Sequence, residues 1–154
     1  MTSSERDENF NAAQNIVPHL VCDGASDAIE FYRNAFGAVE MIRLPGPDGR
    51  LVHASVSING GMVMLVDEML EHDVRGPKRL GGTPVTIHLI VPDVDAFVDR
   101  AVKAGATVIM PVGDQFWGDR YGMVADPFGH HWSIATPGEN APRTSEDLLE
   151  AMKG

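Results

Sequence analysis

The chain lacks several features that mark common protein classes. It has one cysteine, Cys22, so no disulfide can form within the chain and no zinc-finger spacing is present. No run of about 18 apolar residues occurs, as a membrane-spanning helix would need. The polar, acidic start MTSSERDENF does not resemble a secretory signal. We therefore expect no membrane association and a reducing, cytoplasmic location.

Basic residues are also scarce. Lys and Arg total 12 against 22 Asp and Glu, which gives a formal net charge of -10. This charge repels nucleic-acid phosphates and anionic lipids, so we expect neither nucleic acid nor membrane as a partner. The 154 residues are 44% hydrophobic, which is sufficient for the core of one ordinary domain.

The chain contains one structural pattern twice. In each copy a strand precedes a helix that has a capping residue and ends at a glycine, with Ser26 and Gly37 in the first copy and Asp93 and Gly105 in the second. The two helix stops are 68 residues apart (105 − 37). Three strands follow each helix, at residues 38–44, 50–58 and 62–67 in the first copy and at 106–110, 121–126 and 130–136 in the second. The repeat predicts an α+β fold of two βαβββ modules.

The repeat also predicts how the chain is divided. The expected parts are a flexible N-terminal segment (1–14), a domain (15–137) with modules at about 15–67 and 84–137, a Gly- and Pro-rich exposed linker (68–83), and a C-terminal loop and helix (138–154). Thr144 or Ser145 is the expected cap of the last helix, SEDLLEAMK.

Alternation along the strands predicts which histidines share a face. Apolar residues such as Ala54 and Val56 alternate with polar ones, and Trp132 and Ile134 are the natural core pair of the stretch DPFGHHWSI. His130 is then expected on the core side of its turn. The opposite, polar face receives four of the six histidines, namely His19, His53, His88 and His131. A solvated sheet face accounts for any one of them, but histidines from both modules on one face favour a ligand cavity.

Other side chains have competing interpretations. Trp117, in the loop QFWGDRYG, is either a wall on which a ligand stacks or a cover for the open side of the fold. Arg120 either binds an anionic ligand or forms a surface ion pair. Asp126 is expected to stabilise its own turn. Phe31, Tyr32 and Phe36 have helical spacing and are expected in the core.

Three stretches of the sequence carry a resemblance to a known family. The modules with AIEFYRNAFGA and DVDAFVDRAVKAGA, closing on DPFGHHWSI, resemble the vicinal oxygen chelate superfamily of glyoxalases, bleomycin-resistance proteins and extradiol dioxygenases over residues 15–137. The stretch DQFWGDRYGMVADPFGHHW looks like the PhnB-like branch. The resemblance implies that the two modules form a cupped mixed sheet with helices outside. It also implies a homodimer, with modules paired within one chain or exchanged between two.

Metal-using members of this superfamily carry His or Glu ligands at four positions, which fall here on Val17, Met64, Thr86 and Ser133. None of these is a carboxylate or imidazole, so the usual divalent-metal site is not expected. A relocated site with His19 and His88, with or without His53, is the alternative, although no acidic partner is evident.

Two function classes follow from the resemblance. The first is a binding protein for a small, aromatic or drug-like molecule, without metal or other cofactor. Its expected ligand-binding residues are His19, His53, Met64, His88, Trp117, Arg120, His131 and Ser133. The alternative is a metal-dependent lyase, isomerase or dioxygenase that uses the relocated histidine site.

Overall fold

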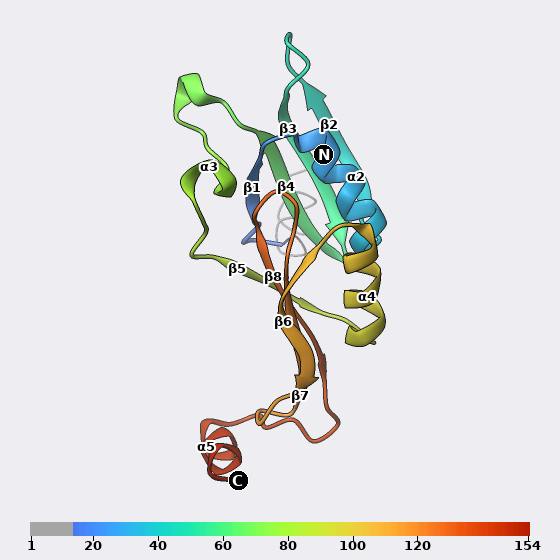
Figure 1. The fold of residues 1–154 in the computed structure, drawn as a ribbon, viewed down its shortest axis with the longest axis vertical. Coiled ribbons are helices and arrows are strands. Elements are labelled where there is room, and N and C mark those ends of the chain that lie inside the picture. The colour runs from blue at the N-terminus through green and yellow to red at the C-terminus, as the bar shows by residue number, and fades with distance from the viewer. Residues whose placement is uncertain (1–13) are drawn as a thin grey trace, which may run out of the picture.

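The computed structural model describes residues 14–154, so the expected flexible segment 1–14 lies outside the described residues apart from Gln14. Figure 1 shows the fold. The elements are β1 (His19–Cys22), α2 (Ala25–Phe36), β2 (Val39–Pro45), β3 (Leu51–Ile58), β4 (Gly61–Asp67), a 3-10 turn η1 (Leu70–His72), α3 (Pro77–Leu80), β5 (Thr86–Ile90), α4 (Val94–Ala104), β6 (Thr107–Asp114), β7 (Asp119–Ala125), β8 (His131–Pro137) and α5 (Ser145–Lys153).

The strands form two sheets with the same topology. The first is ordered β1-β4-β3-β2 and the second β5-β8-β7-β6. In each sheet the first and last strands of the module pair in parallel and the remaining neighbours are antiparallel. The predicted α+β class with two βαβββ modules is therefore confirmed.

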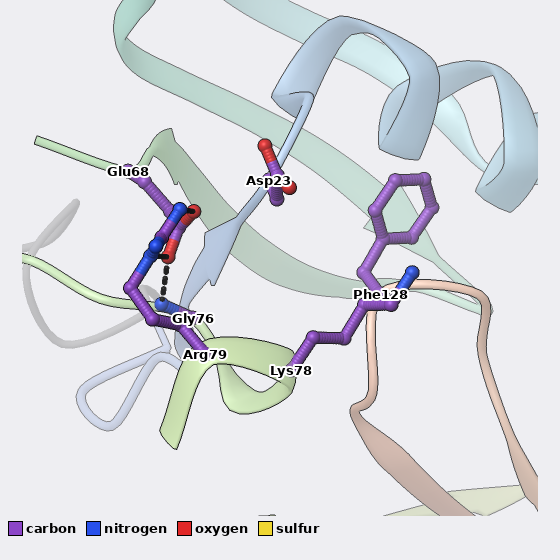
Figure 2. A pocket seen from close by; sticks show the side chains of 6 residues that line it. All are labelled: Asp23, Glu68, Gly76, Lys78, Arg79 and Phe128. Carbon is purple, nitrogen blue, oxygen red and sulfur yellow. Dashed lines mark hydrogen bonds and ion pairs between the residues drawn. The ribbon is translucent and has the colours of Figure 1, made fainter. Parts of the chain in front are cut away.

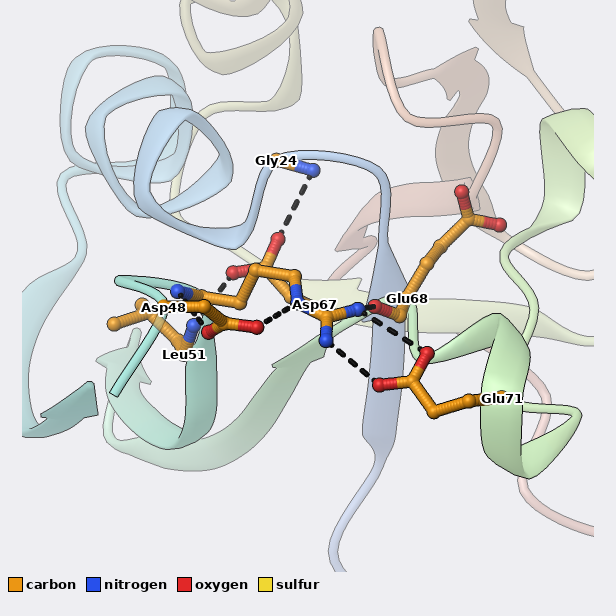
Figure 3. A network of polar contacts seen from close by, with 7 residues as sticks. Gly24, Asp48, Leu51, Asp67, Glu68 and Glu71 are labelled. Carbon is orange, nitrogen blue, oxygen red and sulfur yellow. Dashed lines mark hydrogen bonds and ion pairs between the residues drawn. The ribbon is translucent and has the colours of Figure 1, made fainter. Parts of the chain in front are cut away.

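The helix starts differ from prediction in one case. Asp93 caps α4 by accepting a hydrogen bond from the Ala96 amide, as expected. Ser26 does not cap α2, because α2 already begins at Ala25. The amides of Gly24 and Ala25, at the start of α2, instead donate to the buried Asp67 carboxylate of β4, at 3.2 Å and 2.8 Å. The expectation for Ser26 was wrong because a tertiary contact replaces the local cap (Figure 3).

Asp67 also holds the start of β3. Its second oxygen accepts from the Leu51 amide at 2.7 Å. Beside it, Arg50 contacts Asp48 and Glu71 at 2.7 Å each and donates to the Glu68 carbonyl (Figure 3). One buried carboxylate and one arginine thus fix the positions of α2, β3 and β4 relative to one another.

Helices α2 and α4 pack against each other along the same side of the molecule (Figure 1). The Phe36 and Phe97 rings stack between them with centroids 5.4 Å apart. Arg100 of α4 donates to two carbonyls at the end of α2, those of Asn34 and Arg33. One hydrophobic core therefore contains residues of both modules.

Asp126 joins the two modules within this core. Its Oδ1 accepts from the amides of Phe128 and His130, which confirms the expected role in the turn. Its Oδ2 accepts from the Trp132 indole at 2.9 Å and from the Tyr32 hydroxyl at 2.5 Å. Burial and the Asp126 carboxylate raise the pKa of Tyr32 well above its usual value, so this hydroxyl keeps its proton.

The shared core determines where the other sheet faces point. Each sheet packs one face on the helices, so its second face lies outside the core that the modules share. We call these the module 1 face (the side of β1–β4 that carries His19 and Ser55) and the module 2 face (the side of β5–β8 that carries His88 and Ser133). Within residues 14–154, no helix is long and apolar enough to cross a membrane.

Candidate small-molecule binding site

The module 2 face carries polar and aromatic side chains in register. Pairing places His88, Ser133, Met123 and Met110 side by side across β5, β8, β7 and β6. The Nδ1 atom of His88 lies 2.7 Å from the Ser133 hydroxyl. His88 is exposed, whereas Ser133 is only 4% exposed. The hydrogen bond thus fixes the ring of an exposed histidine.

Two further aromatic rings continue from His88. Tyr121 of β7 stacks on the imidazole with centroids 6.0 Å apart, and Trp117 lies edge-on to Tyr121 at 5.4 Å. The Trp117 indole donates to Asp119 at 3.2 Å, which holds the loop before β7 in place. These three rings, which we call the aromatic row, are partly open to solvent. An arrangement of this kind can stack on a planar ligand.

The module 1 face corresponds to the module 2 face through the sequence repeat. Its corresponding row is His19, Met64, Ser55 and Ile42, across β1, β4, β3 and β2. His53 shares this face two residues from Ser55. The His19 and His53 rings approach edge to face with centroids 6.4 Å apart. The face therefore places two imidazoles and a hydroxyl among apolar side chains.

An open groove of about 550 Å³ lies between β1, the linker and β5. His19 and Thr86 line it, so it borders both sheet faces. Its other walls are largely apolar, with Arg75, Thr83 and His130 as polar members. The His130 ring is held against the Val21 carbonyl at 2.9 Å.

A smaller cavity of about 220 Å³ has a charged lining (Figure 2). It is formed by Asp23, Glu68, Gly76, Lys78, Arg79 and Phe128. Arg79 and the Gly76 amide hydrogen-bond Glu68, which lowers the pKa of Glu68 below its ordinary value. These contacts dock α3 on the end of β4 and assign this cavity a mainly structural role.

The predicted binding residues are not all brought together. His88, Ser133 and His131 share the module 2 face, and Trp117 adjoins it through Tyr121. His19, His53 and Met64 share the module 1 face. Arg120 departs from the expectation that it binds a ligand. It pairs with Asp95 at 2.6 Å and Asp114 at 3.1 Å, on the side of β7 opposite Tyr121, which is the alternative ion-pair interpretation.

The chemistry of the expected metal positions does not fit a divalent cation. Val17 offers no donor atom, and Thr86 and Ser133 offer neutral hydroxyls, the latter already bonded to His88. Met64 offers a soft thioether. Among residues 14–154 no group of three or more His, Cys, Asp or Glu side chains is placed to hold a metal ion.

Sequence reasoning missed Tyr121 and Met123 as site residues, and it placed Ser55 on the polar face without including it among the ligand-binding residues. The sequence did contain a signal for the first two, because Tyr121 and Met123 alternate with Gly122 and Val124 in RYGMVAD. The structure shows Val124 fully buried, which places Tyr121 and Met123 on the opposite face of the strand.

Comparison with known proteins gives a consistent result. A family model described as the Glyoxalase/Bleomycin resistance protein/Dioxygenase superfamily matches residues 15–134. An uncharacterized protein of Mycobacterium tuberculosis is 58% identical over 131 residues, covering 83% of this chain and 77% of that protein. The crystal structure of TioX from Micromonospora sp. ML1 has a TM-score of 0.65 at 28% identity, covering 81% of this chain and 99% of that one. A PhnB protein from Bacillus cereus shares the fold, with a TM-score of 0.64 at 18% identity over 80% of this chain and 99% of that one.

Proposed function

Since the chain belongs to the glyoxalase/bleomycin resistance protein/dioxygenase superfamily, we propose that it binds a small planar aromatic or drug-like molecule without a metal, as a PhnB-like member. The aromatic row of His88, Tyr121 and Trp117 carries this proposal. It combines stacking surface with a fixed imidazole at the open side of a sheet. We also propose a reducing compartment such as the cytoplasm, because the single cysteine, Cys22, is free.

The chemistry of the aromatic row favours a ring that also carries a hydrogen-bonding group. A neutral imidazole has one donor nitrogen and one acceptor nitrogen. Because Nδ1 of His88 is occupied by Ser133, Nε2 is the nitrogen available to a ligand. Aromatic pairs contribute about 0.5–1.5 kcal/mol beyond their buried area, so each ring that stacks on the ligand should raise its affinity about 2- to 12-fold.

We propose that the cavity is shared between two chains. Contacts between the modules run mainly through α2 and α4, so the module 1 and module 2 faces are not closed against each other within one chain. Strand β2 exposes four apolar side chains at its edge, with Val39 at 64% and Met41, Ile42 and Leu44 at 54% each. An edge strand with exposed apolar residues favours association. A homodimer with exchanged modules would cover this edge and place one module 1 face opposite the module 2 face of the second copy.

A metal-dependent lyase, isomerase or dioxygenase is the second candidate. The observation in its favour is the His19–His53 pair, whose rings lie 6.4 Å apart. Against it stands the absence of an acidic partner for these two imidazoles among the described residues. Elemental analysis of untagged protein tests this directly, because close to one zinc, nickel, manganese or iron per chain would establish the metal-dependent candidate.

Binding is tested by titrating the protein with planar aromatic probes that carry a hydrogen-bonding group while tryptophan emission is recorded. Trp117 is partly open to solvent, whereas the second tryptophan, Trp132, is fully buried. His88→Ala should weaken binding about 5- to 100-fold, as expected when a hydrogen-bond partner is lost. His72→Ala is the matched control, because His72 is exposed in η1 and belongs to neither face. Equal affinity of the His88 variant and wild type would contradict the proposed site.

A further inference from the structure

The Ser55 hydroxyl is buried without a hydrogen-bond partner. The residue is only 1% exposed. Within residues 14–154 it is the one buried side-chain nitrogen or oxygen that makes no hydrogen bond. Native proteins pair nearly all such groups, because an unpaired buried hydroxyl has lost its water without compensation. The fold therefore leaves a hydrogen-bonding group whose partner it does not itself supply.

The position of Ser55 connects it to the module 1 face. Ala54 and Val56 on either side point into the core and are fully buried. Ser55 points to the opposite face, between Met64 on β4 and Ile42 on β2. Met64 is half-buried, and its unbranched side chain rotates readily, so a ligand can displace it and reach the hydroxyl.

Two imidazoles lie on the same face. His19 is the register neighbour of Met64, and His53 precedes Ser55 by two residues on β3. A serine hydroxyl can donate or accept, and each neutral imidazole offers one donor and one acceptor. The three groups together match a neutral amide, whose carbonyl oxygen needs a donor and whose N–H needs an acceptor, or a simple carbonyl group, which needs donors alone.

Building on the proposed function, we propose that Ser55, His19 and His53 form a polar subsite for an amide or carbonyl group of the ligand. The ligand then has two parts. Its planar ring stacks on the aromatic row of one copy, while its amide or carbonyl group reaches Ser55 on the module 1 face of the other. This assigns the ligand a chemical class, an aromatic amide or ketone, and assigns Ser55 a role in specificity.

A matched pair of probes tests the subsite. 2-Naphthamide and 2-methylnaphthalene have the same ring, but only the first has a hydrogen-bonding group. Ser55→Ala should weaken 2-naphthamide binding about three- to tenfold and leave 2-methylnaphthalene binding unchanged. Its thermal midpoint should stay the same or rise, because an unpaired buried hydroxyl has been removed. Ser57→Ala, on the same strand and face, is the control and should alter neither affinity.

The outcomes separate this proposal from the proposed function. If Ser55→Ala binds both probes as wild type does while His88→Ala weakens 2-naphthamide binding, the subsite is refuted and the binding function stands. A midpoint lowered by several degrees in Ser55→Ala shows that the hydroxyl has a structural partner, which also refutes the subsite. Wild-type protein that binds neither probe overturns both proposals.

Discussion

Replacing Asp126 by asparagine tests the buried junction between the modules. The substitution keeps the size of the side chain and one acceptor oxygen, which can still serve the Phe128 and His130 amides. It places an amide NH₂ where Oδ2 now accepts from Trp132 and Tyr32. The Tyr32 hydroxyl can turn and accept, but the Trp132 N–H cannot, so one buried donor is left unpaired.

The expected cost follows from these contacts. An unpaired buried donor costs about 1–3 kcal/mol, and the remaining bonds lose the strength that a charged acceptor gives. We expect Asp126→Asn to lower the free energy of unfolding by about 2–4 kcal/mol, which corresponds to a fall of roughly 5–15 °C in the melting temperature. Urea unfolding followed by circular dichroism measures this.

Tyr32→Phe is the matched control for Asp126→Asn. It removes one donor and leaves the carboxylate with three, so its cost should be smaller, about 1–2 kcal/mol. A stability of Asp126→Asn within about 0.5 kcal/mol of wild type would refute the assignment of Asp126 as the junction, since that range is typical of surface changes.

Three further predictions concern other parts of the fold. Burial raises the pKa of Cys22 strongly, so the native thiol should resist a disulfide reagent at pH 8 and react only in urea, whereas rapid native labelling would contradict its burial. Arg100→Ala should destabilise the protein by about 1 kcal/mol because the end of α2 loses two hydrogen bonds, while Lys103→Ala, which breaks an exposed ion pair, should cost about 0.5 kcal/mol or less in the same denaturation assay. The lowered pKa of Glu68 means that its contribution to stability is present above its unfolded pKa of about 4.3 and is lost as pH falls through the lower folded value. The melting temperatures of wild type and Glu68→Gln should therefore converge as the pH falls below the unfolded pKa of about 4.3. A difference that stays constant down to about pH 2.5 would contradict this.

Sequence patterns predicted those elements whose signals are local. The helix 94–104 has its cap, its apolar period and its glycine stop within 13 residues, and the structure reproduces its bounds. Strand alternation correctly placed Trp132 and Ile134 in the core, both with 0% exposure. The expected N-cap Ser26 failed because Asp67, distant in sequence, caps α2 instead.

The candidate site was predicted less completely, for physical reasons. The short helix α3 has four residues and is held by the buried Pro77 and by Glu68, contacts that no local pattern reveals. The position of Arg120 depends on Asp95, which lies 25 residues earlier in the chain. The lack of a partner for Ser55 is a property of three-dimensional packing alone.

Mixing two variants that each bind the ligand weakly tests most directly whether two chains share the cavity. One variant carries His19→Ala on the module 1 face and the other His88→Ala on the module 2 face, and each alone should bind 2-naphthamide weakly. With exchanged modules, each mixed dimer contains one cavity with both substitutions and one with neither. After unfolding and refolding together, equal amounts should recover wild-type affinity in roughly a quarter of all sites, since half of the dimers are mixed. No recovery in a mixture shown to contain mixed dimers would contradict the shared cavity and place each site within a single chain.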